Sequence, residues 1–196
     1  MLVKTSLMEY FKNAVEKAIS ELQVKVNELT AFYIVNLLTV FFRTERVYIG
    51  AEDLRYKTIA QVFLESKFYD ITRRIKALKH IADYSLFMSG FFSESFKRKL
   101  VSIDYFITLG SKAYLDLASI LVDMREKTLV DVYRELGEKF PILVDVLAEV
   151  SEKAIQRRSD LLQVYEKWLR THSQREEKKL RKCGIYPLNI NFTKLQ

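Results

Sequence analysis

Residues 31–42 read AFYIVNLLTVFF and form the most apolar stretch of the 196-residue chain. A helix that crosses a bilayer needs about 20 predominantly apolar residues, whereas this stretch has 12 and contains Asn36 and Thr39. It therefore predicts a helix buried in the core of a globular protein. Asn27 precedes it as a suitable N-cap, so we expect the helix to cover residues 28–43.

Helical periodicity continues on both sides of this stretch. Towards the N-terminus, apolar residues recur on one face of a helix over residues 5–23. Ser66 is a suitable N-cap for a later helix that Gly90 would end. Ser102 is a suitable N-cap for the helix after it. The remaining pattern predicts helices over 52–65, 67–89, 103–124, 159–171 and 173–182, and either two helices or one kinked helix over 126–155, with Gly137 and Pro141 at the interruption.

These segments together predict an all-α fold, a single compact bundle of about eight helices. No internal repeat, low-complexity segment or Gly/Ser-rich linker divides the sequence. We therefore expect one helical domain over residues 1–184. Residues 185–196 have no helical period and are expected to form an extended C-terminal tail.

The chain is basic, with 32 Lys and Arg against 25 Asp and Glu, a net charge of +7. This balance makes an anionic partner plausible, whether nucleic acid, a membrane surface or an acidic protein. Cys183 is the single cysteine, so nothing in the sequence requires an oxidising compartment. The first residues lack the apolar region of a signal peptide. We expect a cytoplasmic protein without a transmembrane segment.

The motifs of common enzymes are missing from the sequence. Neither His80 nor His172 follows an acidic residue by three positions, as di-iron bundles require, and no nucleotide-binding glycine loop occurs. Asp145 and Glu149 lie one turn apart on a predicted helix, but Glu149 can pair with Lys153. We therefore expect a protein that is not an enzyme and that holds no metal or cofactor.

A stripe of basic and aromatic residues marks the predicted helix 67–89. Such a stripe could follow a phosphate backbone and stack on unpaired bases, dock an acidic helix, or be a solvated face whose aromatic residues pack against neighbouring helices. The opposite side carries an apolar face, formed by Phe68, Ile71, Ile75, Leu78 and Ala82. The stripe is spaced at helical intervals and consists of Tyr69, Arg73, Lys76, His80, Asp83 and Phe87.

Two further basic patches lie outside this stripe. One is Lys97, Arg98 and Lys99, between two predicted helices. The other is in the last predicted helix, which could bind nucleic acid or anionic lipid or be a solvated terminal helix. Its basic residues include Lys178, Lys179, Arg181 and Lys182.

Small residues cluster in two predicted helices, around Gly90 and around Gly110. A glycine inside a helix costs about 1 kcal/mol relative to alanine, so it usually has a packing reason. Close packing of the two helices is the favoured interpretation. If they stand apart, the alternative is an apolar pocket with hydroxyl groups, lined by Phe87, Phe91, Tyr105 and Tyr114.

Five segments carry a resemblance that covers most of the chain: FYIVNLLTVFF (32–42), ADYSLFMSGFF (82–92), IDYFITLGSKAY (103–114), KFPILVDVLAEVSE (139–152) and LLQVYEKWLRT (161–171). In order and spacing they resemble a group of bacterial all-helical proteins of unknown function, about 200 residues long. The resemblance implies a bacterial, self-contained helical domain. It implies no activity and no site residue.

The sequence thus favours an adaptor or regulatory module that acts through protein–protein contact. One alternative is a nucleic-acid-binding protein that uses the basic helix faces. Another is a carrier of a small apolar ligand, which would need a closed cavity. Homodimerisation through the apolar helices is also left open.

Overall fold

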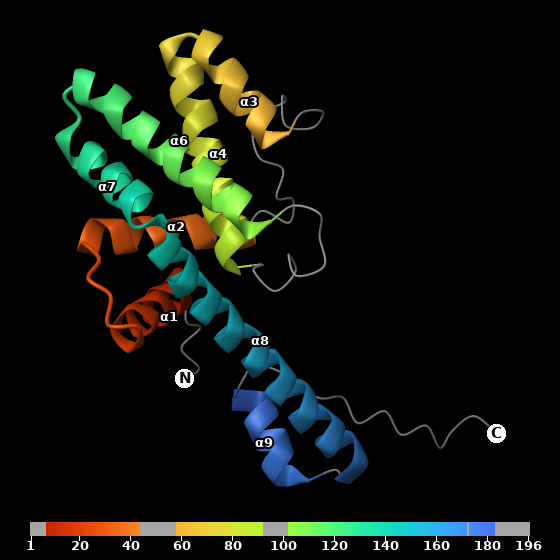
Figure 1. The fold of residues 1–196 in the computed structure, drawn as a ribbon. Helices are drawn as coiled ribbons and strands as arrows, with labels where there is room; N and C mark the ends of the chain where they lie inside the picture. Colours follow the sequence, from red (N-terminus) through yellow and green to blue (C-terminus); the bar gives the residue numbers. More distant parts are fainter. Residues whose placement is uncertain (1–6, 44–57, 92–101, 172, 183–196) are drawn as a thin grey trace. The chain divides into compact units, whose positions relative to one another are not determined.

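The computed structural model of the chain describes residues 7–43, 58–91, 102–171 and 173–182. These ranges contain eight α-helices and one short 3-10 turn, without a strand (Figure 1). The predicted all-α fold is therefore confirmed. Where the sequence predicts one domain over residues 1–184, the chain divides into two compact units, Thr5–Ser151 and Glu152–Gln196 with Met1–Lys4.

The larger unit begins with a pair of helices, α1 (Leu7–Glu21) and α2 (Glu28–Arg43) (Figure 1). α1 packs on α2 and buries Phe11, Val15 and Ala18, which recur at helical spacing on one side. The predicted N-cap of α2 is confirmed, because the side-chain oxygen of Asn27 accepts a hydrogen bond from the backbone N–H of Leu29 at 3.3 Å.

The next elements are α3 (Ile59–Glu65), a 3-10 turn over Ser66–Phe68, and α4 (Ile71–Phe91). Ser66 does not cap the long helix as predicted; its hydroxyl donates to the carbonyl of Phe63 at 2.7 Å. The cap is Asp70, whose carboxylate accepts from the N–H of Arg73 at 3.0 Å. Residues 52–57 of the predicted helix 52–65 lie outside the described residues.

The far end of α4 also differs from the prediction, because the helix continues through Gly90 to Phe91. Gly90 provides space instead of a helix stop. A Cβ at this position would lie 2.4 Å from the Cβ of Leu147, on a later helix.

The next two helices are α6 (Ile103–Asp123), which packs beside α4, and α7 (Lys127–Glu138), which packs beside α6 (Figure 1). The predicted N-cap of α6 is confirmed, because the Ser102 hydroxyl accepts from the N–H of Tyr105. Among the described helices, α6 alone is long and apolar enough to cross a membrane by length and composition. Core helices meet the same criterion, and α6 contributes Ala113, Tyr114 and Leu117 to the core.

α8 (Phe140–Thr171) starts directly after α7, which confirms two helices as the first alternative for residues 126–155. Pro141 lies in the first turn of α8, where its missing N–H breaks no helical hydrogen bond. The predicted break before residue 159 is wrong, since α8 is one helix as far as Thr171. Its residues from Glu152 on belong to the smaller unit, together with α9 (Gln174–Lys182). The predicted tail, 185–196, lies outside the described residues.

The core of the larger unit is closed at Gly110, in the middle of α6. A Cβ there would lie 2.4 Å from Cζ of Phe140 and 2.7 Å from the Cβ of Ser85. The small residues of α4 and α6 therefore allow close packing, which confirms the favoured interpretation of that sequence pattern.

Candidate functional site

The first half of the predicted basic stripe lies on the surface of α4. Arg73 and Lys76 are exposed, and Tyr69 is half-buried. The guanidinium carbon of Arg73 lies 4.0 Å from the centre of the Tyr69 ring, so this cation packs on the aromatic face.

The second half of the stripe turns into the protein. Burial lowers the pKa of His80 to about 4, so its imidazole is neutral at pH 7. Phe87 is only 2% exposed and stacks on Phe41, with ring centres 4.3 Å apart. Asp83 accepts hydrogen bonds from two core tyrosines. Phe87 therefore does not belong to a docking surface, and its packing on Phe41 agrees with the alternative that the aromatic residues of the stripe pack against neighbouring helices.

The predicted core face of the same helix is correct only towards its C-terminal end. Leu78 and Ala82 are fully buried, whereas Phe68 is 91% exposed and Ile71 is half-exposed. The physical reason is that periodicity groups residues by face but does not say how far neighbouring helices extend along the helix. Only the later turns of α4 have both sides enclosed.

The other basic patches are only partly described. Lys97, Arg98 and Lys99 lie outside the described residues. In α9, Lys178 is exposed, Lys179 pairs with Glu176 at 2.9 Å, and Arg181 pairs with Glu177 at 2.7 Å. Lys182 ends α9, and its side chain is outside the described part of the chain. Neighbouring glutamates thus offset two of the cations in this patch.

The four residues of the predicted aromatic pocket belong to two packed clusters. Phe87 stacks on Phe91 at 5.7 Å and Tyr114 lies in the main core. Tyr105 packs against Phe106 at 5.3 Å in a second cluster, and its hydroxyl accepts from the N–H of Ala60 at 3.2 Å. Their rings are engaged with one another and with core neighbours, which gives the pocket prediction no support.

A polar cluster that the sequence did not reveal lies inside the larger unit. One carboxylate oxygen of Asp83 accepts hydrogen bonds from the hydroxyls of Tyr33 at 2.6 Å and Tyr114 at 2.7 Å. The other oxygen binds the ammonium of Lys79, which also lies 5.3 Å from the centre of the Tyr33 ring. Tyr133 completes the group, with its ring stacked on that of Tyr114 at 5.8 Å.

Burial dominates the electrostatics of this cluster. It raises the pKa of Tyr33 and of Tyr114 well above the usual value, and the nearby Asp83 carboxylate raises both further. Both tyrosines therefore stay protonated and act as donors. Burial lowers the pKa of Lys79, but the Asp83 carboxylate raises it by more, so the pKa is raised overall. Because these donors already share the carboxylate, the cluster joins α2, α4 and α6 rather than offering a free reactive group.

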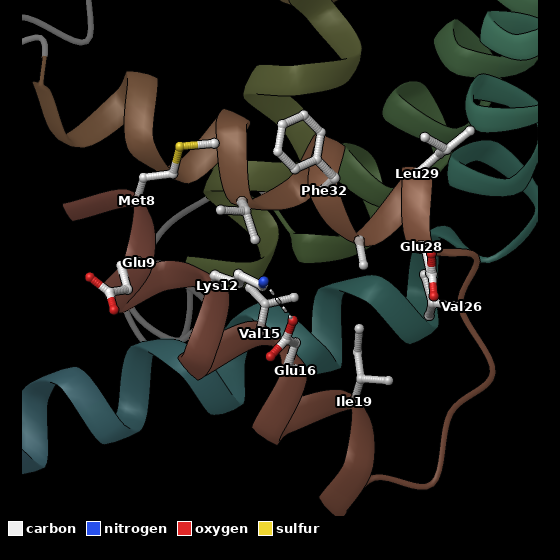
Figure 2. Close-up of a pocket in the computed structure, with 12 residues that line it drawn as sticks. Met8, Glu9, Lys12, Val15, Glu16, Ile19, Val26, Glu28, Leu29 and Phe32 are labelled. Carbon is white, nitrogen blue, oxygen red and sulfur yellow. Dashed lines mark ion pairs between the residues drawn. The ribbon is translucent and has the colours of Figure 1, made fainter. Parts of the chain in front are cut away.

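Metal binding finds no support in the described part of the chain, where no three His, Cys, Asp or Glu side chains come together. A groove of about 770 Å³ lies between α1 and α2 (Figure 2). Its floor contains the buried Val15 and Val35. The other lining residues are Met8, Glu9, Lys12, Glu16, Ile19, Val26, Glu28, Leu29, Ala31 and Phe32.

The groove has an apolar interior and a charged edge. Leu29 is 51% and Phe32 is 53% exposed, so two large apolar side chains of α2 face solvent at its wall. The edge carries Glu9, Glu16 and Glu28 against the single Lys12 (Figure 2). The prediction that the 28–43 helix is buried thus holds for one side only.

A signal for this exposed side was present in the sequence. α2 is apolar on nearly every side, and such a helix is either buried all round or presents apolar surface to something else. Leu29, Phe32 and Val40 lie on the exposed side of α2.

Comparison with known proteins finds no matching family model, no matching curated protein and no matching solved structure. The resemblance to bacterial helical proteins therefore stays a prediction.

Proposed function

We propose that the protein is a non-enzymatic adaptor or regulatory module that binds an amphipathic helix of a partner protein in the α1–α2 groove. The observation that carries this proposal is the pair of half-exposed side chains, Leu29 and Phe32, beside a buried apolar floor. Grooves of this kind receive the apolar face of a helix through side chains spaced at i, i+3, i+4 and i+7.

Contacts with α7 and with the residue that follows it hold the start of the groove wall in place, which supports docking of a partner. Glu135 of α7 accepts hydrogen bonds from the hydroxyl of Thr30 at 2.5 Å and from the N–H of Asn27 at 3.2 Å. The ammonium of Lys139 binds the same carboxylate at 2.8 Å and the carbonyl of Lys25 at 2.6 Å. These contacts fix the start of α2 and the link before it, which reduces the entropy lost on binding.

The two alternative functions receive less support. A nucleic-acid interface on α4 loses Phe87 and the charge of His80 to the interior. A carrier of a small apolar ligand would enclose most of its cargo, about 70–90% of the ligand surface, whereas Leu29 and Phe32 leave the groove wall open to solvent. The groove volume itself suits a ligand, so the carrier is retained as an outcome of the test.

The test measures binding of a labelled synthetic helix to the full chain by fluorescence anisotropy. The probe is a peptide of about 16 residues, or four turns, with Leu at i, i+3, i+4 and i+7 and uncharged polar residues elsewhere. Phe32→Asp places a charge at the groove wall and is expected to weaken binding by about tenfold or more.

Phe68→Asp is the matched control, because Phe68 is a more exposed phenylalanine, in the 3-10 turn before α4 and outside the groove lining. It should leave the affinity unchanged, and both variants should keep the wild-type helicity by circular dichroism. Failure of the peptide to bind the wild type, or equal losses in the two variants, would contradict the proposal. Tighter binding of an alkyl-chain probe than of any peptide would favour the carrier.

A further inference from the structure

The groove is acidic although the protein is basic. Its lining includes three glutamates and one lysine, a local net charge of −2, while the whole chain carries +7. Lys12 is the only cation among the described residues that line the groove, and its ammonium already lies 3.8 Å from the carboxylate of Glu16 (Figure 2). The groove therefore presents acidic groups at its edge.

These acidic groups lie on both walls. Glu9 is in the first turn of α1 and Glu28 is in the first turn of α2, and both are exposed. A helix seated on the apolar floor would have its polar flanks next to these carboxylates. A flank of the same charge would face repulsion, which is how an interface rejects wrong partners.

We infer that the partner helix is basic, with Lys or Arg along the flanks of its apolar face. This inference rests on the proposed function and adds the chemistry of the partner to it. An acidic helix, which the overall charge of +7 would attract at long range, is then disfavoured in the groove itself.

The experiment compares two versions of the same synthetic amphipathic helix on the full-length protein. One has Lys at the flanking positions and the other has Glu, with the same apolar face and matched helicity. Binding is measured near physiological ionic strength, where the Debye length is about 8 Å, so distant charges are screened and the groove edge is not. We expect the Lys version to bind more tightly, and the preference to shrink as salt is raised.

Glu28→Lys tests whether the groove edge causes this preference. It should reduce the preference for the Lys version by about two- to fivefold, the effect typical of one exposed charge pair. Glu126→Lys is the matched control, because Glu126 is also an exposed glutamate, at the N-cap of α7. It makes the same change in net charge and should leave the preference as in the wild type. Glu28→Gln removes the charge without placing a cation at the helix start.

The outcomes separate this inference from the proposed function. Equal or tighter binding of the Glu version, or equal effects of Glu28→Lys and Glu126→Lys, would overturn the basic partner while leaving groove docking intact. Absence of binding by both peptides, with Phe32→Asp behaving as the wild type, would overturn both. Self-association of the chain that Phe32→Asp abolishes would identify a second copy as the occupant instead.

Discussion

Asp83 accounts for the polar interior of the larger unit at the scale of single residues. It receives donors from α2, α6 and its own helix, and its side chain is 13% exposed. A buried carboxylate costs little only when each of its oxygens has partners. The tyrosines meet that need here while their rings still contribute apolar area to the core.

Replacing Asp83 by Ala should destabilise the protein by about 3–5 kcal/mol, because the Tyr33 and Tyr114 hydroxyls and Lys79 lose their acceptor together. Asp83→Asn keeps one acceptor oxygen and should cost less. Asp116→Ala is the control, since Asp116 forms a more exposed pair with Lys112 at 2.7 Å, and should cost about 1 kcal/mol or less. Urea unfolding of the three variants measures these losses. Similar losses at positions 83 and 116 would contradict the structural role of the cluster.

His80 predicts a specific pH dependence of stability. Its pKa falls from 6.5 to about 4 in the folded protein because burial disfavours the charged ring. The unfolded state therefore binds a proton at His80 at a higher pH than the folded state does. The contribution of the neutral ring to the free energy of unfolding is fully present above pH 6.5 and is lost as the pH falls towards 4.

The measurement is the unfolding free energy of the wild type and of His80→Gln between pH 4 and pH 7.5. The difference between the two proteins largely removes the contribution of other titrating groups. Below pH 6.5 the wild type should lose stability faster than the variant. Parallel curves, or an NMR titration of His80 near 6.5, would rule out the buried neutral ring.

At the scale of elements, glycines determine how closely the helices approach. Gly137, in the last turn of α7, lies beside Leu115, whose Cγ would lie 2.7 Å from an added Cβ. Gly90 and Gly110 likewise leave room for Leu147 and Phe140. Each glycine weakens its own helix by about 1 kcal/mol relative to alanine, a cost that the tighter contact between helices offsets.

Gly110→Ala should therefore destabilise the protein by about 1–3 kcal/mol despite the better helix propensity, because the new methyl group overlaps the Phe140 ring and Ser85. Ser119→Ala on the exposed side of the same helix gains propensity without a clash and should be neutral or slightly stabilising. Thermal unfolding of both variants checks the sign. A stabilising Gly110→Ala would show that α6 and its neighbours can separate at little cost.

At the scale of the whole molecule, the net charge of the chain and the local charge of the groove have opposite signs. The net charge of +7 belongs to the chain as a whole, whereas the α1–α2 groove is locally acidic. Because exposed charges are screened beyond about 8 Å at physiological ionic strength, net charge governs the first approach of a partner and local charge governs the bound complex. The overall composition therefore favours acidic partners at long range, whereas the basic partner helix proposed here would meet the acidic edge of the groove.

The sequence by itself determined the helical class and most of the local structure. Helical periodicity and the caps at Asn27 and Ser102 depend on residues within one or two turns of each other, so they can be read from a short window. The same reasoning placed Gly110 at a close approach and divided the chain near Pro141. It failed at Ser66, because Asp70 caps α4 instead. It also failed at Gly90, where α4 continues and packs closely against Leu147.

Only the tertiary structure decided which helical faces are covered. The tyrosine partners of Asp83 are 50 and 31 residues away along the chain, and the groove depends on how α1 lies against α2. Periodicity states which side chains share a face, but burial depends on the length and position of the neighbouring helix. For that reason the predicted surface stripe ended in the core at Phe87, and the predicted core helix exposed Leu29 and Phe32.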